Sequence, residues 1–224
     1  MYYLNVLKLF VSFGDQLDRI SHAERIRNVW KLTGLLVFAS IVTYGLMAYM
    51  GIGSALIMSG GAAYTPAEYE SSKLWFIIGR SLAGAVSALA MICIPAMIFK
   101  WLIIEVPFQK LMAMQLGVFV IVLIERLTWI PLAVFFGLDW FVSPFSFGVI
   151  ASHLTSKPWL IYFFGSISIF QLWIISFQIK FLNRMLGEKE KSVWLAVIFL
   201  RFLEWVLAAI VVFGSPYVIG RWFS

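Results

Sequence analysis

Residues 111–138 form a long apolar run that carries two charged side chains, Glu125 and Arg126, near its middle. As a helix, residues 111–124 alone would reach only about 21 Å, short of the roughly 30 Å hydrocarbon core of a bilayer. The whole run therefore predicts one membrane crossing with both charges inside it. Each charge costs roughly 2.5 to 3.5 kcal/mol at mid-bilayer, so we expect both to find partners on another span.

The composition extends this expectation to the whole chain. Hydrophobic residues make up 62% of the 224 positions and charged residues only 12%. The apolar runs lack the strict alternation of barrel strands, and lipid tolerates no unpaired backbone groups. The sequence predicts an all-α, polytopic helical membrane protein with one membrane domain, residues 34–224. Its five transmembrane helices are expected at about 34–58, 74–99, 111–138, 159–181 and 193–213.

The lead-in, residues 1–33, has a basic and amphipathic character. Within residues 3–13 the polar positions lie three and four apart, on one face of a helix: Asn5, Lys8 and Ser12. This pattern predicts an amino-terminal amphipathic helix that lies in the membrane interface. We expect Gly14 to end that helix and Asp15 to cap a second one. The lead-in serves either as a basic membrane anchor or as a docking surface for a cytosolic partner.

The distribution of Lys and Arg predicts the orientation. Eleven of the 17 basic residues are predicted to lie on the same side of the membrane as the amino terminus: Lys8, Arg19, Arg25, Arg27, Lys31, Lys100, Lys110, Lys180, Arg184, Lys189 and Lys191. Only Lys73, Lys157 and Arg221 lie on the other side. This asymmetry places the amino terminus in the cytoplasm and the carboxyl terminus outside. The net charge of +6 favours anionic lipid head groups over nucleic acid as a partner, because the basic residues flank spans.

Two spans carry patterned small or polar residues. In the second span, small residues at helical spacing let a neighbouring helix approach closely: Gly84, Ser87 and Ala88. In the fourth span, polar residues at spacings of three and seven share one face: Ser168, Gln171 and Gln178. This polar face either forms hydrogen bonds between helices or lines a polar path.

The connections carry turn and cap signals. Gly60-Gly61 predicts a turn after the first span, followed by a polar loop over residues 62–73. Ser143-Pro144 has the chemistry of a helix cap and first turn, which predicts a short outer helix over residues 145–154. That helix is too short to cross the membrane. Ser215-Pro216 is expected to end the last span.

The fifth span carries Arg201 and Glu204, which are three residues apart and therefore share one face near mid-depth. Their charges balance those of Glu125 and Arg126. We expect a four-member charge network that joins the third and fifth spans. The network either fixes the register of the helices, or acts as a functional relay or substrate contact.

Catalytic chemistry has little support in the sequence. His22 and His153 fall on opposite sides of the predicted membrane, so they cannot share a metal ion or a triad. Cys93 is the single cysteine, which excludes an internal disulfide and a thiolate metal site. No GxSxG or HExxH motif occurs. We therefore expect no enzyme activity, no metal and no cofactor.

The layout resembles the Yip family, the Ypt/Rab-interacting-protein domain of five-span membrane proteins. The resemblance covers a basic lead-in, a second span rich in small residues, and three short motifs: Pro107-Phe108-Gln109, Ser143-Pro144-Phe145-Ser146-Phe147 and Phe170-Gln171-Leu172-Trp173. The long polar amino-terminal extension of many eukaryotic members is absent, so the chain looks like a bacterial member of the family. This implies a location in the bacterial cell membrane.

The resemblance implies a function without catalysis. Eukaryotic Yip proteins act in vesicle traffic with small GTPases and with one another, and some bacterial members look like accessory subunits beside ABC-type exporters. The leading expectation is a membrane scaffold or an accessory subunit of a transport, export or trafficking complex, with self-association or other membrane proteins such as ABC-type transporter subunits as partners. The rival expectation is a small transporter or channel that uses the polar face of the fourth span and the mid-membrane charges.

Overall fold

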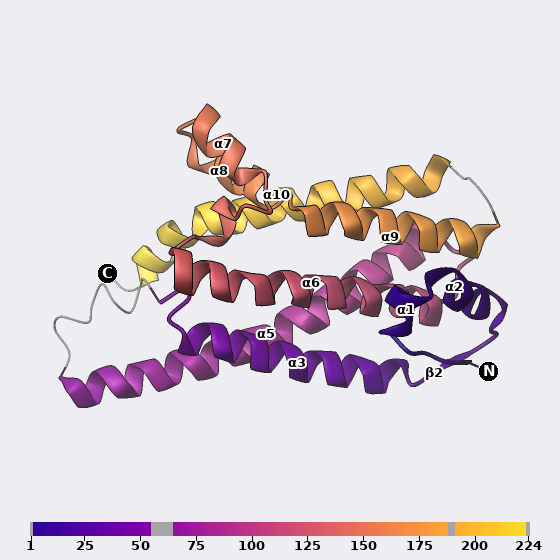
Figure 1. Ribbon diagram of the computed structural model, residues 1–224, viewed down its shortest axis with the longest axis horizontal. Helices are drawn as coiled ribbons and strands as arrows, with labels where there is room; N and C mark the ends of the chain where they lie inside the picture. The colour runs from indigo at the N-terminus through magenta and orange to yellow at the C-terminus, as the bar shows by residue number, and fades with distance from the viewer. Residues whose placement is uncertain (1, 55–64, 188–190, 223–224) are drawn as a thin grey trace. The chain divides into compact units, whose positions relative to one another are not determined.

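The computed structural model describes residues 2–54, 65–187 and 191–222, and nearly all of its regular structure is helical (Figure 1). The exception is a pair of two-residue parallel strands, β1 (Tyr2–Tyr3) and β2 (Ile26–Arg27). The chain divides into two compact units, Met1–Ile130 and Pro131–Ser224. The predicted all-α class is confirmed.

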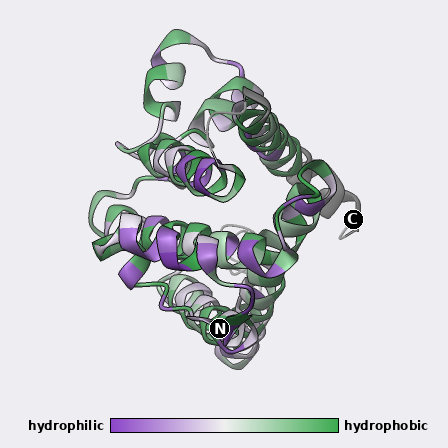
Figure 2. Cartoon of the chain, turned by 90° about the vertical axis from the view of Figure 1, so that its right-hand side faces the viewer, coloured by the Kyte–Doolittle hydropathy of each residue, from purple (hydrophilic) through white to green (hydrophobic). Residues whose placement is uncertain are grey.

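Four helices in the described residues are long and apolar enough to cross a membrane. They are α3 (Val29–Tyr49), α5 (Pro66–Leu102), α6 (Phe108–Phe136) and, over Val193–Phe213, the helix α10 (Lys191–Trp222). They correspond to the predicted first, second, third and fifth spans. Hydrophobic residues dominate the long helices (Figure 2). These four candidate spans are compatible with a membrane protein.

The predicted fourth span, residues 159–181, is wrong as a single helix. The segment divides into α8 (Pro158–Gly165) and α9 (Ile169–Leu186). Ser168 has extended backbone between them, and its side chain accepts a hydrogen bond from the N–H of Gln171, so it caps α9. The break is stabilised by backbone pairing with an earlier segment, in which the N–H of Ile169 donates to the carbonyl of Phe145 at 2.9 Å.

The same pairing shortens the predicted outer helix. Instead of residues 145–154, α7 covers Gly148–Leu154, after the one-turn 3₁₀ helix η2 (Trp140–Val142). The N–H of Phe147 donates to the carbonyl of Ile167 at 3.0 Å, which holds the preceding residues out of the helix. At the other end of this unit, α10 continues through positions 215 and 216, where we expected it to end. A proline removes only one backbone donor, and a long apolar helix accommodates that loss.

The amino-terminal segment does not form the predicted interfacial helix over residues 3–13. Only α1 (Lys8–Val11) and α2 (Phe13–His22) are helical, and the break falls at Ser12, so Gly14 lies inside α2. Asp15 lies in the first turn of α2 and does not cap it. The reason is that β1 pairs with β2, and the side chain of Asn28 bonds both the N–H and the carbonyl of Leu4, at 3.0 and 2.9 Å.

The helices α3 and α5 form a hairpin whose ends differ from the prediction. The first span begins at Val29 and its helix ends at Tyr49, while the predicted turn at Gly60-Gly61 lies outside the described residues. Residues 66–73, predicted as loop, are the first two turns of α5. A capping box between Thr65 and Glu68, with Pro66 at the first helical position, starts the helix early. Its 37 residues span about 55 Å.

Candidate functional site

A buried arginine lies between α9 and α10 of the second unit. Arg201 is only 4% exposed, and its guanidinium makes two side-chain hydrogen bonds. Its Nε donates to Oε1 of Gln178 at 3.0 Å, and its Nη1 donates to Oε2 of Glu204 at 2.6 Å. Arg201 lies eight residues after Val193, about 12 Å into the apolar segment of α10. The cluster therefore sits near the midpoint of a candidate span.

The two hydrogen-bond partners of Arg201 lie on two different helices. Glu204 is three residues further along α10, so the ion pair spans one helical turn. Gln178 is fully buried and reaches Arg201 from α9. The Glu204 side chain is 35% exposed, whereas that of Arg201 is 5% exposed. One end of this cluster is thus closed and the other is accessible.

The cluster also holds donors beyond those two bonds. Two nitrogen atoms of the cluster, Nη2 of Arg201 and Nε2 of Gln178, are buried and have no hydrogen-bond acceptor in the part of the chain that the structure describes. The same holds for Nε1 of Trp205, the residue after Glu204. Each such donor costs about 1–3 kcal/mol when it stays unpaired in an apolar environment. The arrangement can therefore recognise an oxygen acceptor, such as a carboxylate or a carbonyl group.

Glu125 and Arg126 lie on α6 in the first unit. Glu125 is 7% exposed, and its backbone carbonyl accepts a hydrogen bond from Oγ1 of Thr128 at 2.7 Å. The guanidinium carbon of Arg126 lies 3.8 Å from the centre of a Trp129 ring, a cation–π contact. The predicted link from these two residues to the arginine cluster stays a prediction, because it would join separate units.

The three residues of the predicted polar face have different surroundings. Ser168 caps α9: its side-chain oxygen accepts a hydrogen bond from the backbone N–H of Gln171. Gln178 is the partner of Arg201. Sequence reasoning placed Gln178 on a polar face but missed that partner. The available signal was a buried amide and a buried arginine, each near the middle of its helix.

The predicted packing residues of α5 are Gly84, Ser87 and Ala88, and Gly84 contacts α3 directly. The carbonyl of Gly84 accepts hydrogen bonds from Oγ of Ser40 at 2.8 Å and from Oγ of Ser87 at 3.0 Å. A Cβ atom at Gly84 would lie 2.9 Å from Cβ of Tyr44. Ala88 is fully buried one turn further on. The two helices therefore approach to backbone contact at this point.

No metal centre emerges from the described residues, in which no three His, Cys, Asp or Glu side chains are placed to hold an ion. Cys93 is a half-buried free thiol.

No family model, no curated protein and no solved structure matches the chain.

Proposed function

We propose that the chain is a non-enzymatic integral membrane protein that acts as a scaffold or accessory subunit of a membrane complex. The observation that carries this proposal is the state of Arg201, which is 4% exposed and bonded to Gln178 and Glu204. The hydrogen bond from Arg201 to Gln178 joins α10 to α9, and a buried polar contact between helices can fix their register. The intramembrane charge then stabilises a fixed surface and does not line a path.

The length of α5 supports a partner outside the bilayer as well. Its roughly 55 Å exceed the 30 Å hydrocarbon core by about 25 Å, so its ends extend into or beyond the head groups. The first turns carry exposed polar side chains, including Glu68 and Glu70. We place the protein in a bacterial cell membrane with its amino terminus in the cytoplasm, as a protein of Yip type.

The test is a pull-down from native membranes in mild detergent with a tagged full-length chain. We expect another membrane protein, for example a transporter permease, to co-purify in stoichiometric amount. An unrelated tagged membrane protein of similar size is the control for neighbours that are merely co-solubilised. Purification of the chain alone, as a monomer or homo-oligomer, would contradict an accessory role. Transport assays with the purified chain in liposomes would then be the next experiment.

A second candidate function, a small transporter or channel, is supported by the unpaired donors of Arg201, Gln178 and Trp205. Donors of this kind at mid-membrane also suit a solute that carries an oxygen acceptor.

Thiol labelling separates the two candidates. In a Cys93→Ala background, Gln178→Cys should react with a water-soluble thiol reagent only if water reaches the cluster. Ile174→Cys is the matched control, because Ile174 is equally buried one turn earlier on α9. A scaffold predicts equally slow labelling at both positions, and a transporter predicts faster labelling at position 178.

A further inference from the structure

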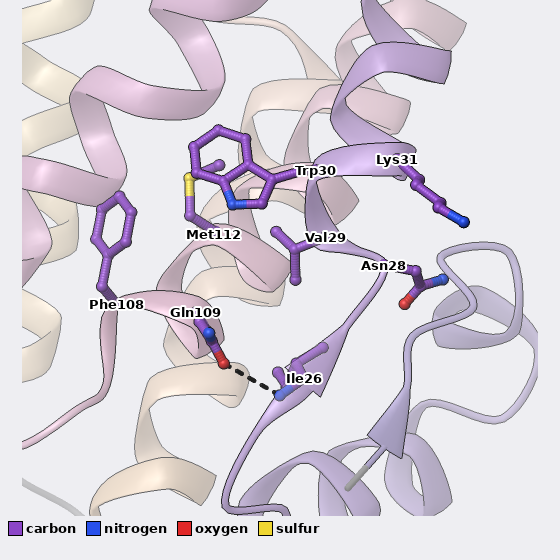
Figure 3. A pocket seen from close by; sticks show the side chains of 8 residues that line it. All are labelled: Ile26, Asn28, Val29, Trp30, Lys31, Phe108, Gln109 and Met112. Carbon is purple, nitrogen blue, oxygen red and sulfur yellow. Dashed lines mark hydrogen bonds between the residues drawn. The ribbon is translucent and has the colours of Figure 1, made fainter.

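A pocket of about 210 Å³ lies at the beginning of α3, within the first unit (Figure 3). Its walls come from three segments: β2 and the turn after it, the first residues of α3, and the first residues of α6. The lining residues are Ile26, Asn28, Val29, Trp30, Lys31, Phe108, Gln109 and Met112. Most of these are apolar, and Asn28, Lys31 and Gln109 add polar groups. The lining is thus mainly apolar, with three polar side chains.

Specific long-range hydrogen bonds hold the walls in place. Oε1 of Gln109 accepts from the backbone N–H of Ile26 at 3.2 Å, the bond drawn in Figure 3. Nζ of the next residue, Lys110, donates to the carbonyl of Ser21 at 2.7 Å. Both bonds join the lead-in to the first turn of α6, more than eighty residues further along the chain. These two bonds fix the walls of the pocket relative to one another.

The position of the pocket identifies its surroundings. Val29 is the first residue of a helix long and apolar enough to cross a membrane, and insertion of that helix would bring the pocket to the level of the lipid head groups. Trp30 is 70% exposed, and Figure 3 shows its ring directed toward Met112 and Phe108. Tryptophan is enriched at this level of a bilayer because its ring is apolar and its N–H is polar. Lipid, and not bulk water, is the medium that suits this exposed ring.

The charge around the pocket is positive. Lys31 is one of the lining residues and is exposed, and in Figure 3 its ammonium end points away from Trp30 and Phe108. Between residues 19 and 31 the chain carries four basic residues and one acidic residue, Glu24. Juxtamembrane Lys and Arg residues attract anionic lipids with about 1 kcal/mol each.

From this placement we infer that the pocket binds the phosphate and upper acyl region of an anionic phospholipid. Lys31 pairs with the phosphate, and the Gln109 amide, whose oxygen is committed to Ile26, offers its Nε2–H₂ as a donor. Trp30, Phe108 and Met112 contact the glycerol end of the acyl chains. The inference depends on membrane insertion at Val29 and is independent of whether the protein is a scaffold or a transporter.

The test measures lipids retained by the purified full-length chain in mild detergent, by native mass spectrometry. The probes are phosphatidylglycerol and phosphatidylcholine with identical acyl chains. We expect the chain to prefer phosphatidylglycerol, and Lys31→Gln to lower that preference about fivefold, the factor that corresponds to one basic residue. Lys31→Arg should keep it. Trp30→Leu should weaken retention of both lipids.

Matched variants control for general effects. Lys157→Gln removes another exposed positive charge, and Trp75→Leu removes a ring that is 72% exposed on α5. Both should bind lipid like the parent chain. Equal loss in Lys31→Gln and Lys157→Gln would overturn the inference, since attraction would then reflect net charge alone. Release of phosphatidylglycerol by equimolar inorganic phosphate would also overturn it and identify a site for free phosphate.

Discussion

The two helix pairs of this chain are held together by different means. The α3–α5 pair makes contact through the backbone of α5 at Gly84, where Ser40 and Tyr44 of α3 lie against it. The α9–α10 pair makes contact through long side chains, Gln178 and Arg201, which meet between the helices. In the first pair the absence of a side chain at Gly84 is essential, and in the second pair the hydrogen-bonding groups are essential.

This difference follows from the bilayer as a solvent. Apolar side chains gain little from packing against each other in lipid, because the acyl chains are equally apolar. Helices therefore associate either by close van der Waals packing over small residues or by polar contacts that lipid cannot replace. The first mode tolerates no added volume, and the second tolerates no unpaired group. Substitutions that add volume or remove a partner should therefore act on one pair and spare the other.

The largest effect is expected from Gly84→Val. A Cβ at this position would lie 2.9 Å from Cβ of Tyr44 and 3.1 Å from the carbonyl oxygen of Ser40, so α3 must move away. We expect a loss of about 3 kcal/mol in the free energy of unfolding, measured by denaturant titration in detergent. Gly79→Ala is the control, because a Cβ there meets nothing within 4 Å. Equal stability of both variants would show that the backbone contact is absent.

Glu204→Gln, which breaks the ion pair within α10, should lower the free energy of unfolding by about 2 kcal/mol. Removing one member of a buried ion pair typically costs 3–5 kcal/mol, and the 35% exposure of the Glu204 side chain reduces that cost. The double variant Arg201→Met with Glu204→Gln should recover most of the loss, because it leaves no unpaired charge. Denaturant titration of the two single variants and the double variant measures the coupling. Strictly additive losses would show that the pair is not energetically coupled.

Gln178→Leu should cost about 1.5 kcal/mol, because Nε of Arg201 loses its acceptor while the shape of the α9 surface is nearly kept. Gln171→Leu, a half-buried amide on the same helix, is the comparison. The unfolding free energies of the two variants provide the measurement. A larger loss at position 171 than at position 178 would contradict the assignment of Gln178 as the link between α9 and α10.

The features that the sequence predicted well are those set by local hydrophobic length. The apolar run 111–138 became α6 (Phe108–Phe136), and the fifth predicted range, 193–213, coincides with the apolar segment of α10. A helix in lipid must satisfy its backbone internally, so a long apolar run leaves few alternatives. Thr65, with Glu68 three residues after it, matches the sequence pattern of a capping box and indicates the start of α5. This start nevertheless falls within the predicted loop over residues 62–73.

The remaining features depend on contacts between distant residues. Ser168 reads as one polar residue within a long apolar stretch, and its role as a cap follows from pairing of its neighbours with Phe145 and Phe147. The contact of Gln178 with Arg201 joins positions 23 residues apart, and its register depends on how α9 and α10 pack. Both roles are decided by tertiary structure, which periodicity does not encode.

The predicted link between the two units can be measured by charge exchange. Glu125→Arg and Arg201→Glu should each destabilise the chain, and the double variant should regain about 1 kcal/mol relative to the sum of the single losses. The physical reason is that two ionisable groups at mid-membrane gain most from pairing with each other. Denaturant titration of all four proteins provides the cycle. A coupling energy of zero would remove this pair from the predicted network and leave each unit with its own charges.

The smallest effect is expected from Ser40→Ala, which removes one hydrogen bond from the α3–α5 pair and adds no volume. The carbonyl of Gly84 keeps a second side-chain donor, Oγ of Ser87 at 3.0 Å, so no buried acceptor is left unpaired. We expect a loss of about 0.5 kcal/mol in the free energy of unfolding, about a third of that for Gln178→Leu. Ser87→Ala is the matched control. A loss at position 40 as large as that of Gly84→Val would mean that the hydrogen bond, and not the absence of a side chain at Gly84, holds the first pair together.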